Sequence, residues 1–339
     1  MAPRVILPFV IPSIDIGSLF GADSAVRREV DRAIVGAAAE VGFIQVGGLP
    51  PSISPSSGRL QQLKRIFSLP PEQQHPLWRQ KFAAAHDNIY RGWFPLQEGH
   101  PTYKEGIDIG PDVAHGVERI DAGDPLCEGT PLPAEPALPG WRTAVAAYYR
   151  GMEQTGQVMM RSIARGLDLP EDTFGSLFER GISTLRLIRY PPRADGAPTS
   201  GAAHVDSGLL TLLAQDGVGG LQAKHRSGTW IDVPAAHDSL VVNFGRLMEL
   251  WTAGRIRATE HRVIGVGQER YSVPFFYEPR VDALIAPLPP AETRPRTAAF
   301  LPFLYGDFVW AAATRFVEFS GLQHRRPPRG GALPHEMLK

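Results

Sequence analysis

The chain has 339 residues, 43% of them apolar, and its 35 basic and 35 acidic side chains give a formal net charge of zero. This composition predicts a globular protein with one large domain or two smaller ones, and nothing in it indicates a polyanionic partner such as nucleic acid. A single cysteine, Cys127, excludes an internal disulfide framework and favours a reducing, cytoplasmic location. The apolar run near the N-terminus is broken by Pro8 and Pro12, so we expect an entry strand there, not a signal peptide or a membrane span.

Residues 1–140 are expected to form an N-terminal helical and loop region of the same domain as the rest. Apolar residues recur at helical spacing between positions 23 and 43, which predicts one amphipathic helix followed by a short strand, GFIQVGG. The stretch GRLQQLKRIFSLP predicts a second helix that Pro70 ends. Residues 71–140 are rich in Pro, Gly and His, and we expect extended or looped segments there.

The second half passes from one long helix to many short strands. The segment WRTAVAAYYRGMEQTGQVMMRSIARGL, beginning at Trp141, predicts a helix with a buried apolar stripe. From residue 183 onward, short β-rich segments are separated by turns without intervening helices, which favours an antiparallel sandwich or barrel. We therefore predict a mainly β protein with flanking helices, a core at 141–310 that includes the long helix, and a C-terminal helix and tail at 311–339.

A candidate metal site begins with His204 and Asp206. Residues two apart on a strand point to the same face, ~6.6 Å apart along the chain, so both side chains can reach one ion. A pair of this kind is weak evidence alone, and His261, in RATEHRVI, is the best candidate for a third ligand. Two histidines and one carboxylate are typical of non-haem Fe(II) oxygenases, which keep positions open for a cosubstrate and dioxygen. The same ligands could hold catalytic zinc, so a hydrolase is an alternative.

The stretch ERYSVPFF favours the iron site over the zinc site. On a strand, Arg270 and Ser272 share a face, and a guanidinium beside a hydroxyl can bind one carboxylate. Such a pair is expected for a 2-oxo-diacid cosubstrate, whose distal carboxylate must be anchored while its other end chelates the metal. A zinc hydrolase has no need of it.

The order of these residues resembles the isopenicillin N synthase-like family of Fe(II)/2-oxoglutarate-dependent dioxygenases. His204-x-Asp206 is followed after 54 intervening residues by His261, and then by Arg270-x-Ser272. The stretches IPSIDIG, AAAEVGFIQVGG, LRLIRYPP and HVDSGLLTLLAQDGVGGLQ extend the resemblance over roughly residues 10 to 310. It implies a double-stranded β-helix (jelly roll) core, and it implies Fe(II), 2-oxoglutarate and dioxygen, with the two histidines and the aspartate as the catalytic metal ligands.

The strand predicted at STLRLIRYPP places Arg186, Ile188 and Tyr190 on one face. The resemblance implies that Tyr190 helps Arg270 and Ser272 to hold 2-oxoglutarate. Plant flavonoid and hormone oxygenases of the family carry an asparagine where Ile188 stands. Isopenicillin N synthase uses no 2-oxoglutarate and also reads LIRYP, so a 2-oxoglutarate-independent oxidase is an alternative.

The substrate side of the site is expected to contain further residues. A buried arginine facing such a pocket needs an anion, so Arg186 is expected to bind an acidic group of the substrate or, alternatively, to form a salt bridge with a local acid. The family has NxGD where this chain has NFGR, and the sequence assigns no role to Arg246. The resemblance implies substrate contacts or a lid for a further group of residues, namely Thr211, Leu213, Leu221, Phe276, Tyr90, Arg91 and Trp93.

Together these features predict an oxygenase that oxidises a C–H bond of a small, acidic, specialised metabolite. Hydroxylation, desaturation, cyclisation and ring opening are all compatible with the sequence, because the outcome depends on how the substrate is placed. We expect a small-molecule substrate and no nucleic acid, membrane or obligate protein partner. The alternatives are the 2-oxoglutarate-independent oxidase, a non-catalytic binding protein with the same fold, and the zinc hydrolase.

Overall fold

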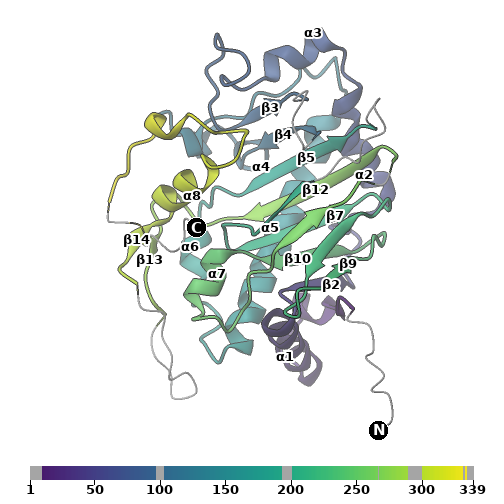
Figure 1. Ribbon diagram of the computed structural model, residues 1–339, viewed down its shortest axis with the longest axis vertical. Helices are drawn as coiled ribbons and strands as arrows, with labels where there is room; N and C mark the ends of the chain where they lie inside the picture. Colours follow the sequence, from purple (N-terminus) through teal and green to yellow (C-terminus); the bar gives the residue numbers. More distant parts are fainter. Residues whose placement is uncertain are drawn as a thin grey trace.

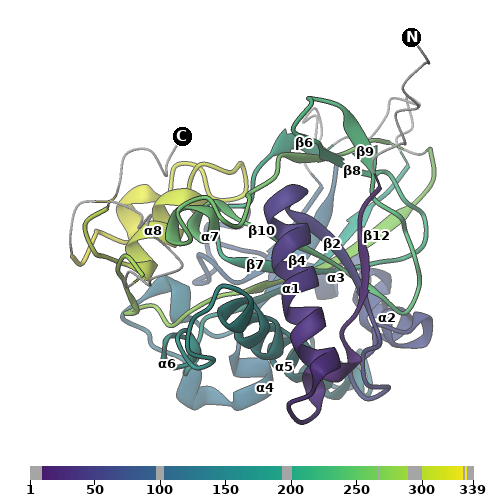
Figure 2. The same ribbon diagram turned by 90° about the horizontal axis from the view of Figure 1, so that it is seen from below.

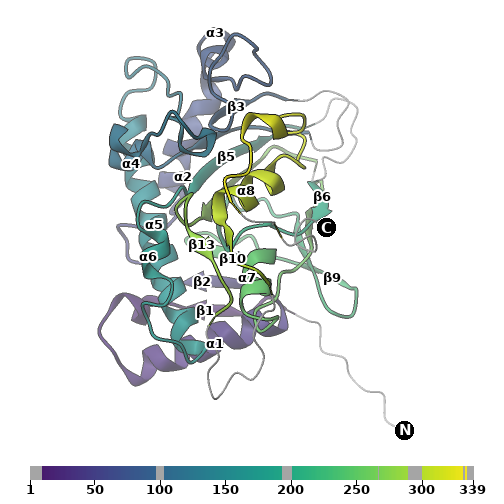
Figure 3. The same ribbon diagram turned by 90° about the vertical axis from the view of Figure 1, so that its left-hand side faces the viewer.

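Two facing sheets form the centre of the protein. The computed structural model describes residues 10–96, 103–192, 201–265, 267–288, 300–330 and 333. The large sheet has the strand order β1-β2-β10-β7-β12-β5-β4-β3, and the small sheet has the order β6-β11-β8-β9. Figures 2 and 3 show the small sheet on one side of the large sheet and the long helices on the other.

Between residues 184 and 277 the chain alternates between the two sheets. β5, β7, β10 and β12 lie in the large sheet, whereas β6, β8, β9 and β11 lie in the small one. This alternation of antiparallel strands is the jelly-roll arrangement, so the predicted fold class is confirmed. The eight strands are β5 (Thr184–Tyr190), β6 (Gly201–His204), β7 (Leu210–Gln215), β8 (Leu221–Lys224), β9 (Trp230–Asp232), β10 (Leu240–Phe244), β11 (His261–Val263) and β12 (Arg270–Tyr277).

The N-terminal part of the chain contributes strands as well as helices. β2 pairs with β10 and β4 pairs with β5, so residues from this part extend both edges of the large sheet. A separate two-stranded sheet lies near the C-terminus. These strands are β1 (Ser13–Asp15), β2 (Phe43–Gly47), β3 (Gly92–Phe94), β4 (Glu105–Ile109), β13 (Leu284–Ile285) and β14 (Phe303–Leu304).

The outer face of the large sheet is covered by α5, which packs on β12 and β7, and by α1 beside it (Figure 3). The stripe predicted on α5 is buried from Trp141 to Ile163. On α1, Ser24 caps the first turn by accepting a hydrogen bond from the backbone N–H of Arg27 at 3.1 Å. The helices are α1 (Ala25–Glu40), α2 (Ser57–Lys64), α3 (Pro71–Gln74), α4 (Asp112–His115), α5 (Trp141–Gly166), α6 (Gly175–Phe178), α7 (Arg246–Trp251) and α8 (Tyr305–Ala313), with short 3-10 turns η1 (Gly17–Phe20), η2 (Arg65–Ser68), η3 (His75–Leu77), η4 (Val117–Arg119), η5 (Pro125–Cys127) and η6 (Gln323–Arg325).

The space between the sheets is filled at one end and hollow at the other. An apolar cluster that includes Phe43, Leu213, Leu221 and Val241 fills the closed end. At the hollow end, α8 lies against the strands (Figure 1). This helix begins at Tyr305, ahead of the C-terminal region predicted at 311–339. Within the described ranges, no helix combines the length and the apolar character needed to cross a bilayer.

Candidate active site

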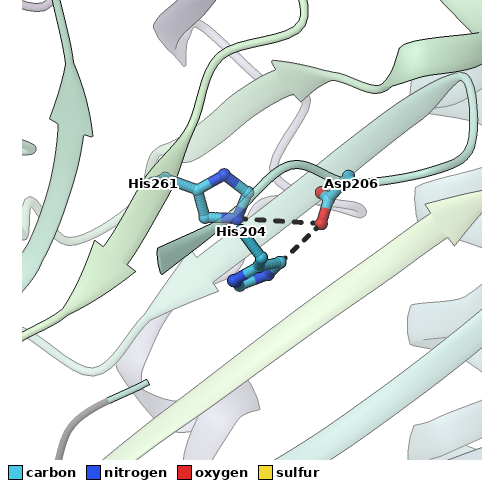
Figure 4. A group of neighbouring side chains, drawn as sticks. All are labelled: His204, Asp206 and His261. Carbon is cyan, nitrogen blue, oxygen red and sulfur yellow. Dashed lines mark ion pairs between the residues drawn. The ribbon is translucent and has the colours of Figure 1, made fainter. Parts of the chain in front are cut away.

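His204, Asp206 and His261 converge at the edge of the hollow space. His204 ends β6 and His261 begins β11, and the two residues are direct partners in the antiparallel pairing of these strands. One carboxylate oxygen of Asp206, Oδ1, lies 3.6 Å from Nε2 of His204 and 3.7 Å from Nε2 of His261 (Figure 4). One potential ligand atom from each of the three residues lies within 4.8 Å of the other two, so together they could hold one metal ion.

Backbone carbonyls orient both imidazoles. Nδ1 of His204 lies 2.8 Å from the carbonyl oxygen of Ala202, and Nδ1 of His261 lies 3.1 Å from that of Thr259. A carbonyl can only accept, so Nδ1 carries the proton in each ring and Nε2 keeps its lone pair. Burial, followed by the neighbouring His261, lowers the pKa of His204 and favours the neutral imidazole that a metal requires.

Neighbouring side chains also orient the carboxylate of Asp206. Its Oδ2 accepts hydrogen bonds from Thr211 Oγ1 and Asn243 Nδ2, both at 2.7 Å, which leaves Oδ1 facing the histidines. Thr211 and Asn243 are themselves partners across β7 and β10. Burial by itself would raise the pKa of Asp206, but the two histidines and these hydrogen bonds hold it below its usual range. The three residues therefore offer one carboxylate oxygen and two imidazole nitrogens, a set that fits Fe(II).

The segment after Asp206 is held by the start of α7. The backbone N–H of Arg246 donates to the carbonyl of Asp206 at 2.8 Å, and that of Leu247 donates to the carbonyl of Ser207 at 3.1 Å. A side chain at Gly245 would collide with the carbonyl of Gly208, so the NFGR motif needs glycine at its third position. The backbone N–H of Arg246 thus helps to hold the segment after Asp206. Its side chain is half-exposed and lies 3.9 Å from the carboxylate of Glu249.

Arg270, Ser272 and Tyr190 lie together on the inner face of the large sheet. Arg270 is the direct partner of Tyr190 across β12 and β5, and its guanidinium carbon lies 5.0 Å from the centre of the tyrosine ring. Nε of Arg270 donates to the carbonyl of Gly219 at 2.8 Å. Nη1 is buried, and within the described residues it has no hydrogen-bond partner. A buried guanidinium N–H beside a hydroxyl is suited to a carboxylate.

A cavity of about 590 Å³ opens beside the metal-ligand candidates. This volume is in the range of small-molecule sites. Its wall includes His204, Asp206 and Tyr190, together with four of the residues predicted on the substrate side, namely Arg186, Thr211, Phe276 and Tyr90.

The other predicted substrate-side residues lie behind this wall in the described structure. Leu213 and Leu221 belong to the apolar cluster at the closed end between the sheets. Ile188 is a buried partner of Ser272, and it is not part of the cavity wall formed by the described residues. Trp93 is fully buried against Phe67, because β3 is an edge strand covered by the N-terminal helices.

Two arginines predicted near the substrate have other partners. The guanidinium of Arg186 binds Asp108 of the neighbouring β4, with Nε 2.6 Å from Oδ1 and Nη2 2.8 Å from Oδ2. Asp108 also binds the fully buried Arg79. Of the two expectations for Arg186, the structure therefore shows the salt bridge to a local acid. Arg91 is also buried, and it donates to Thr184 and to the carbonyl of Ile182.

Several residues of the site had no role assigned from the sequence. Asn243 holds Asp206, and the cavity wall also includes Lys104, Glu278, Phe316 and Glu318. Glu278 follows β12 and is an even number of positions from Arg270 and Ser272. Had the alternation of the predicted strand been continued to residue 278, it would have placed Glu278 on the same face. Phe316 and Glu318 follow α8, and no periodic pattern in the sequence places them opposite the metal-ligand candidates. Cys127 is half-buried, and burial raises the pKa of its thiol to about 11, which agrees with a structural residue rather than a nucleophile.

Comparison with known proteins finds two family models that match different parts of the chain. The family described as the 2OG-Fe(II) oxygenase superfamily matches residues 181–279, and the family described as non-haem dioxygenase in morphine synthesis N-terminal matches residues 11–130. The 2-oxoglutarate-dependent dioxygenase traH of Penicillium crustosum is 30% identical over 301 residues, which is 85% of this chain and 89% of that protein.

Two further proteins are similar to this chain over most of their length. Isopenicillin N synthase of Streptomyces clavuligerus is 29% identical over 314 residues, covering 88% of this chain and 93% of that protein. The crystal structure of a full-length Neurospora crassa protein in complex with alpha-KG superimposes with a TM-score of 0.75 at 26% identity, covering 88% of this chain and 94% of the other. The chain therefore belongs to the isopenicillin N synthase-like family of the 2OG-Fe(II) oxygenase superfamily, and its relatives include non-haem dioxygenases named as 2-oxoglutarate-dependent.

Proposed function

We propose that His204, Asp206 and His261 hold Fe(II), and that the enzyme oxidises a C–H bond of a small specialised metabolite bound in the adjoining cavity. The observation that carries the proposal is the approach of Asp206 Oδ1 to Nε2 of both histidines at 3.6 and 3.7 Å. Iron bound there would supply one-electron and dioxygen chemistry at the cavity wall.

We further propose that Arg270, Ser272 and Tyr190 hold the distal carboxylate of 2-oxoglutarate. The buried Nη1 of Arg270, which lacks a partner among the described residues, supports this role. The bond from Nε of Arg270 to Gly219 fixes the guanidinium before a ligand arrives, so little side-chain entropy is lost on binding. These residues would place the keto acid end of 2-oxoglutarate toward the histidines.

The chain's own residues would orient the substrate and exclude water. Phe276 and Thr211 are direct partners across β12 and β7, and both line the cavity. Thr211 also binds Asp206, so a substrate resting on this pair would lie beside the metal ligands. From the opposite side, Phe316 faces His204 with ring centroids 6.2 Å apart. Hydroxylation, desaturation, cyclisation and ring opening are all compatible with this arrangement.

An acidic group on the substrate is not part of this proposal. That expectation depended on Arg186, whose guanidinium binds Asp108. A second cation of the wall, Lys104, lies 2.7 Å from Glu318, and Arg315 also lines the cavity. The contacts of Arg186 and Lys104 therefore give no support for an acidic substrate. The cytoplasmic location expected from the single cysteine likewise remains a proposal.

The 2-oxoglutarate-independent oxidase remains a second candidate because of Ile188. This residue stands where 2-oxoglutarate-dependent relatives of the plant type carry an amide, and isopenicillin N synthases are among the relatives of the chain. In that case Arg270 and Ser272 would hold a carboxylate of the substrate itself.

Succinate formation tests the proposal and separates the two candidates. The purified protein should convert 2-oxoglutarate to succinate in a reaction that requires Fe(II) and dioxygen, and His204→Ala should abolish it. Arg270→Ala should raise the concentration of 2-oxoglutarate needed for half-maximal rate at least tenfold, because a charge-assisted bond is lost. Dioxygen uptake with substrate but without 2-oxoglutarate would favour the oxidase, and full activity of His204→Ala would refute the ligand assignment.

A further inference from the structure

The inner face of β12 continues beyond the cosubstrate end of the site to Glu278, the residue that directly follows the strand. Arg270, Ser272, Phe276 and Glu278 have the same parity, so their side chains follow one face. Glu278 lies six positions after Ser272, which corresponds to about 20 Å along a strand. Glu278 lines the cavity at the end away from Arg270, and Phe276 lies between them beside the metal ligands.

The carboxyl group of Glu278 is buried and bound by two neutral hydroxyls. Tyr305 donates to Oε1 and Thr184 donates to Oε2, each at 3.1 Å. Thr184 in turn accepts a bond from Nη1 of Arg91 at 2.6 Å, which orients its hydroxyl toward Glu278. The residue is only 6% exposed, and it is one of the residues that line the cavity.

These contacts leave part of the hydrogen-bonding capacity of Glu278 unused. A carboxylate has about four acceptor positions, and each oxygen of Glu278 accepts one bond from these hydroxyls. A purely structural link between β12 and α8 would not need a carboxyl that reaches the cavity. A buried polar group beside a ligand cavity gains from a ligand that completes its hydrogen bonds.

Aromatic side chains form part of the cavity wall near Glu278. Tyr90 and Phe319 are stacked with ring centroids 5.2 Å apart and planes 30° apart, and both line the cavity. Phe276 forms the wall nearer the metal ligands. Walls of this kind fit a flat and largely apolar body.

We propose that Glu278 recognises the substrate by accepting a hydrogen bond from an N–H or O–H group at one end of a flat, largely apolar molecule. The inference rests on the proposed function, because it takes this cavity as the substrate site. Glu278 is then a specificity-determining residue. By fixing one end of the molecule it determines which carbon lies beside Asp206, Thr211 and Phe276.

Binding of matched probe pairs tests the inference. Each pair has the same flat body and differs in one donor: quinolin-2(1H)-one and its N-methyl derivative, indole and N-methylindole, 2-naphthol and 2-methoxynaphthalene. Binding is measured anaerobically at about pH 8.5, where the carboxyl group of Glu278 is ionised, to the protein loaded with Fe(II) and 2-oxoglutarate, so that no turnover occurs. At least one donor probe should bind the wild type about tenfold more tightly than its methylated partner, as one hydrogen bond in a buried site predicts.

Variants assign this preference to Glu278. Glu278→Met keeps the volume but removes the acceptor, so both members of a pair should bind equally. Glu278→Gln keeps one acceptor oxygen and should retain a reduced preference, even if the methionine variant folds poorly. Glu318→Gln alters a different carboxylate of the wall, so it shows whether the preference depends on Glu278 in particular. If the methyl group is simply too large for the cavity, the methylated probe should bind more weakly than its partner in every variant. If the preference comes from a hydrogen bond to Glu278, it should decrease only in the Glu278 variants.

The outcomes separate this inference from the proposed function. The visible charge-transfer absorption of the Fe(II)–2-oxoglutarate chelate reports metal and cosubstrate binding in each sample. If this absorption forms but no donor probe is preferred, the role of Glu278 is refuted and the oxygenase assignment stands. A preference that survives in both Glu278 variants, or that disappears only in Glu318→Gln, also refutes it. If the absorption does not form in the wild type, the proposed function fails first.

Discussion

The ionisation of Glu278 makes the stability of the protein depend on pH in a defined window. Burial is the main cause that raises the pKa of this carboxyl group from 4.5 to about 7 in the folded protein. The folded state therefore binds the proton more strongly than the unfolded state, so stability falls as pH rises between these two values. A difference of this size corresponds to about 3 kcal/mol of folding free energy, present below pH 4.5 and lost above pH 7.

Glu278→Gln isolates this effect because an amide does not titrate. The free energy of unfolding, measured by urea denaturation with metal chelated, is compared for the wild type and the variant between about pH 4.5 and about pH 8.5. As the pH rises across this range, the free energy of unfolding of the variant should increase relative to that of the wild type by about 3 kcal/mol. Any pH-independent change caused by the substitution cancels in the comparison. A difference that is the same at both ends of the range would refute the assignment of a raised pKa to Glu278.

Three further substitutions test other parts of the site. Asp108→Asn should destabilise the protein by about 3–5 kcal/mol in denaturant unfolding, because Arg79 and Arg186 lose their buried counterion; an effect near zero would contradict the ion cluster. Asn243→Ala should weaken Fe(II) binding about 10–100-fold in an anaerobic titration, because Asp206 loses an orienting bond, and unchanged affinity would count against that role. Ser272→Ala should raise the concentration of 2-oxoglutarate needed for half-maximal succinate formation several-fold while leaving Fe(II) affinity unchanged, and an unchanged requirement would remove Ser272 from the cosubstrate site.

The residues predictable from sequence are those fixed by short-range geometry. Arg270 and Ser272 share a face of β12, as strand periodicity predicts, whereas Asp206 lies two residues beyond the end of β6 and approaches His204 from the following loop. The helix-then-strand order and the buried stripe of α5 could also be read directly from periodicity. His261 could be placed only because its segment reads as a later strand, and its direct pairing with His204 required the sheet register.

Contacts that depend on long-range packing could not be predicted in the same way. Asp108 lies in a stretch expected to be extended or looped, and nothing local shows that β4 pairs with β5 and brings this carboxylate to Arg186. Trp93 and Leu221 are apolar, and apolar residues occur both in pocket walls and in the buried core. Their character alone therefore could not show that they lie in the core. Glu318 approaches Lys104 only because the segment after α8 folds back over the cavity.

An anaerobic titration with Fe(II), followed by the metal content of the protein after desalting, tests the central claim most directly. The wild type should bind one Fe(II) per chain, and Asp206→Ala should lose that ion, because Oδ1 is the atom that faces both imidazoles. Thr211→Val, which removes only a bond to the opposite carboxylate oxygen, should weaken binding without abolishing it. Stoichiometric binding that is equally tight in the wild type and in Asp206→Ala would contradict the proposed metal centre.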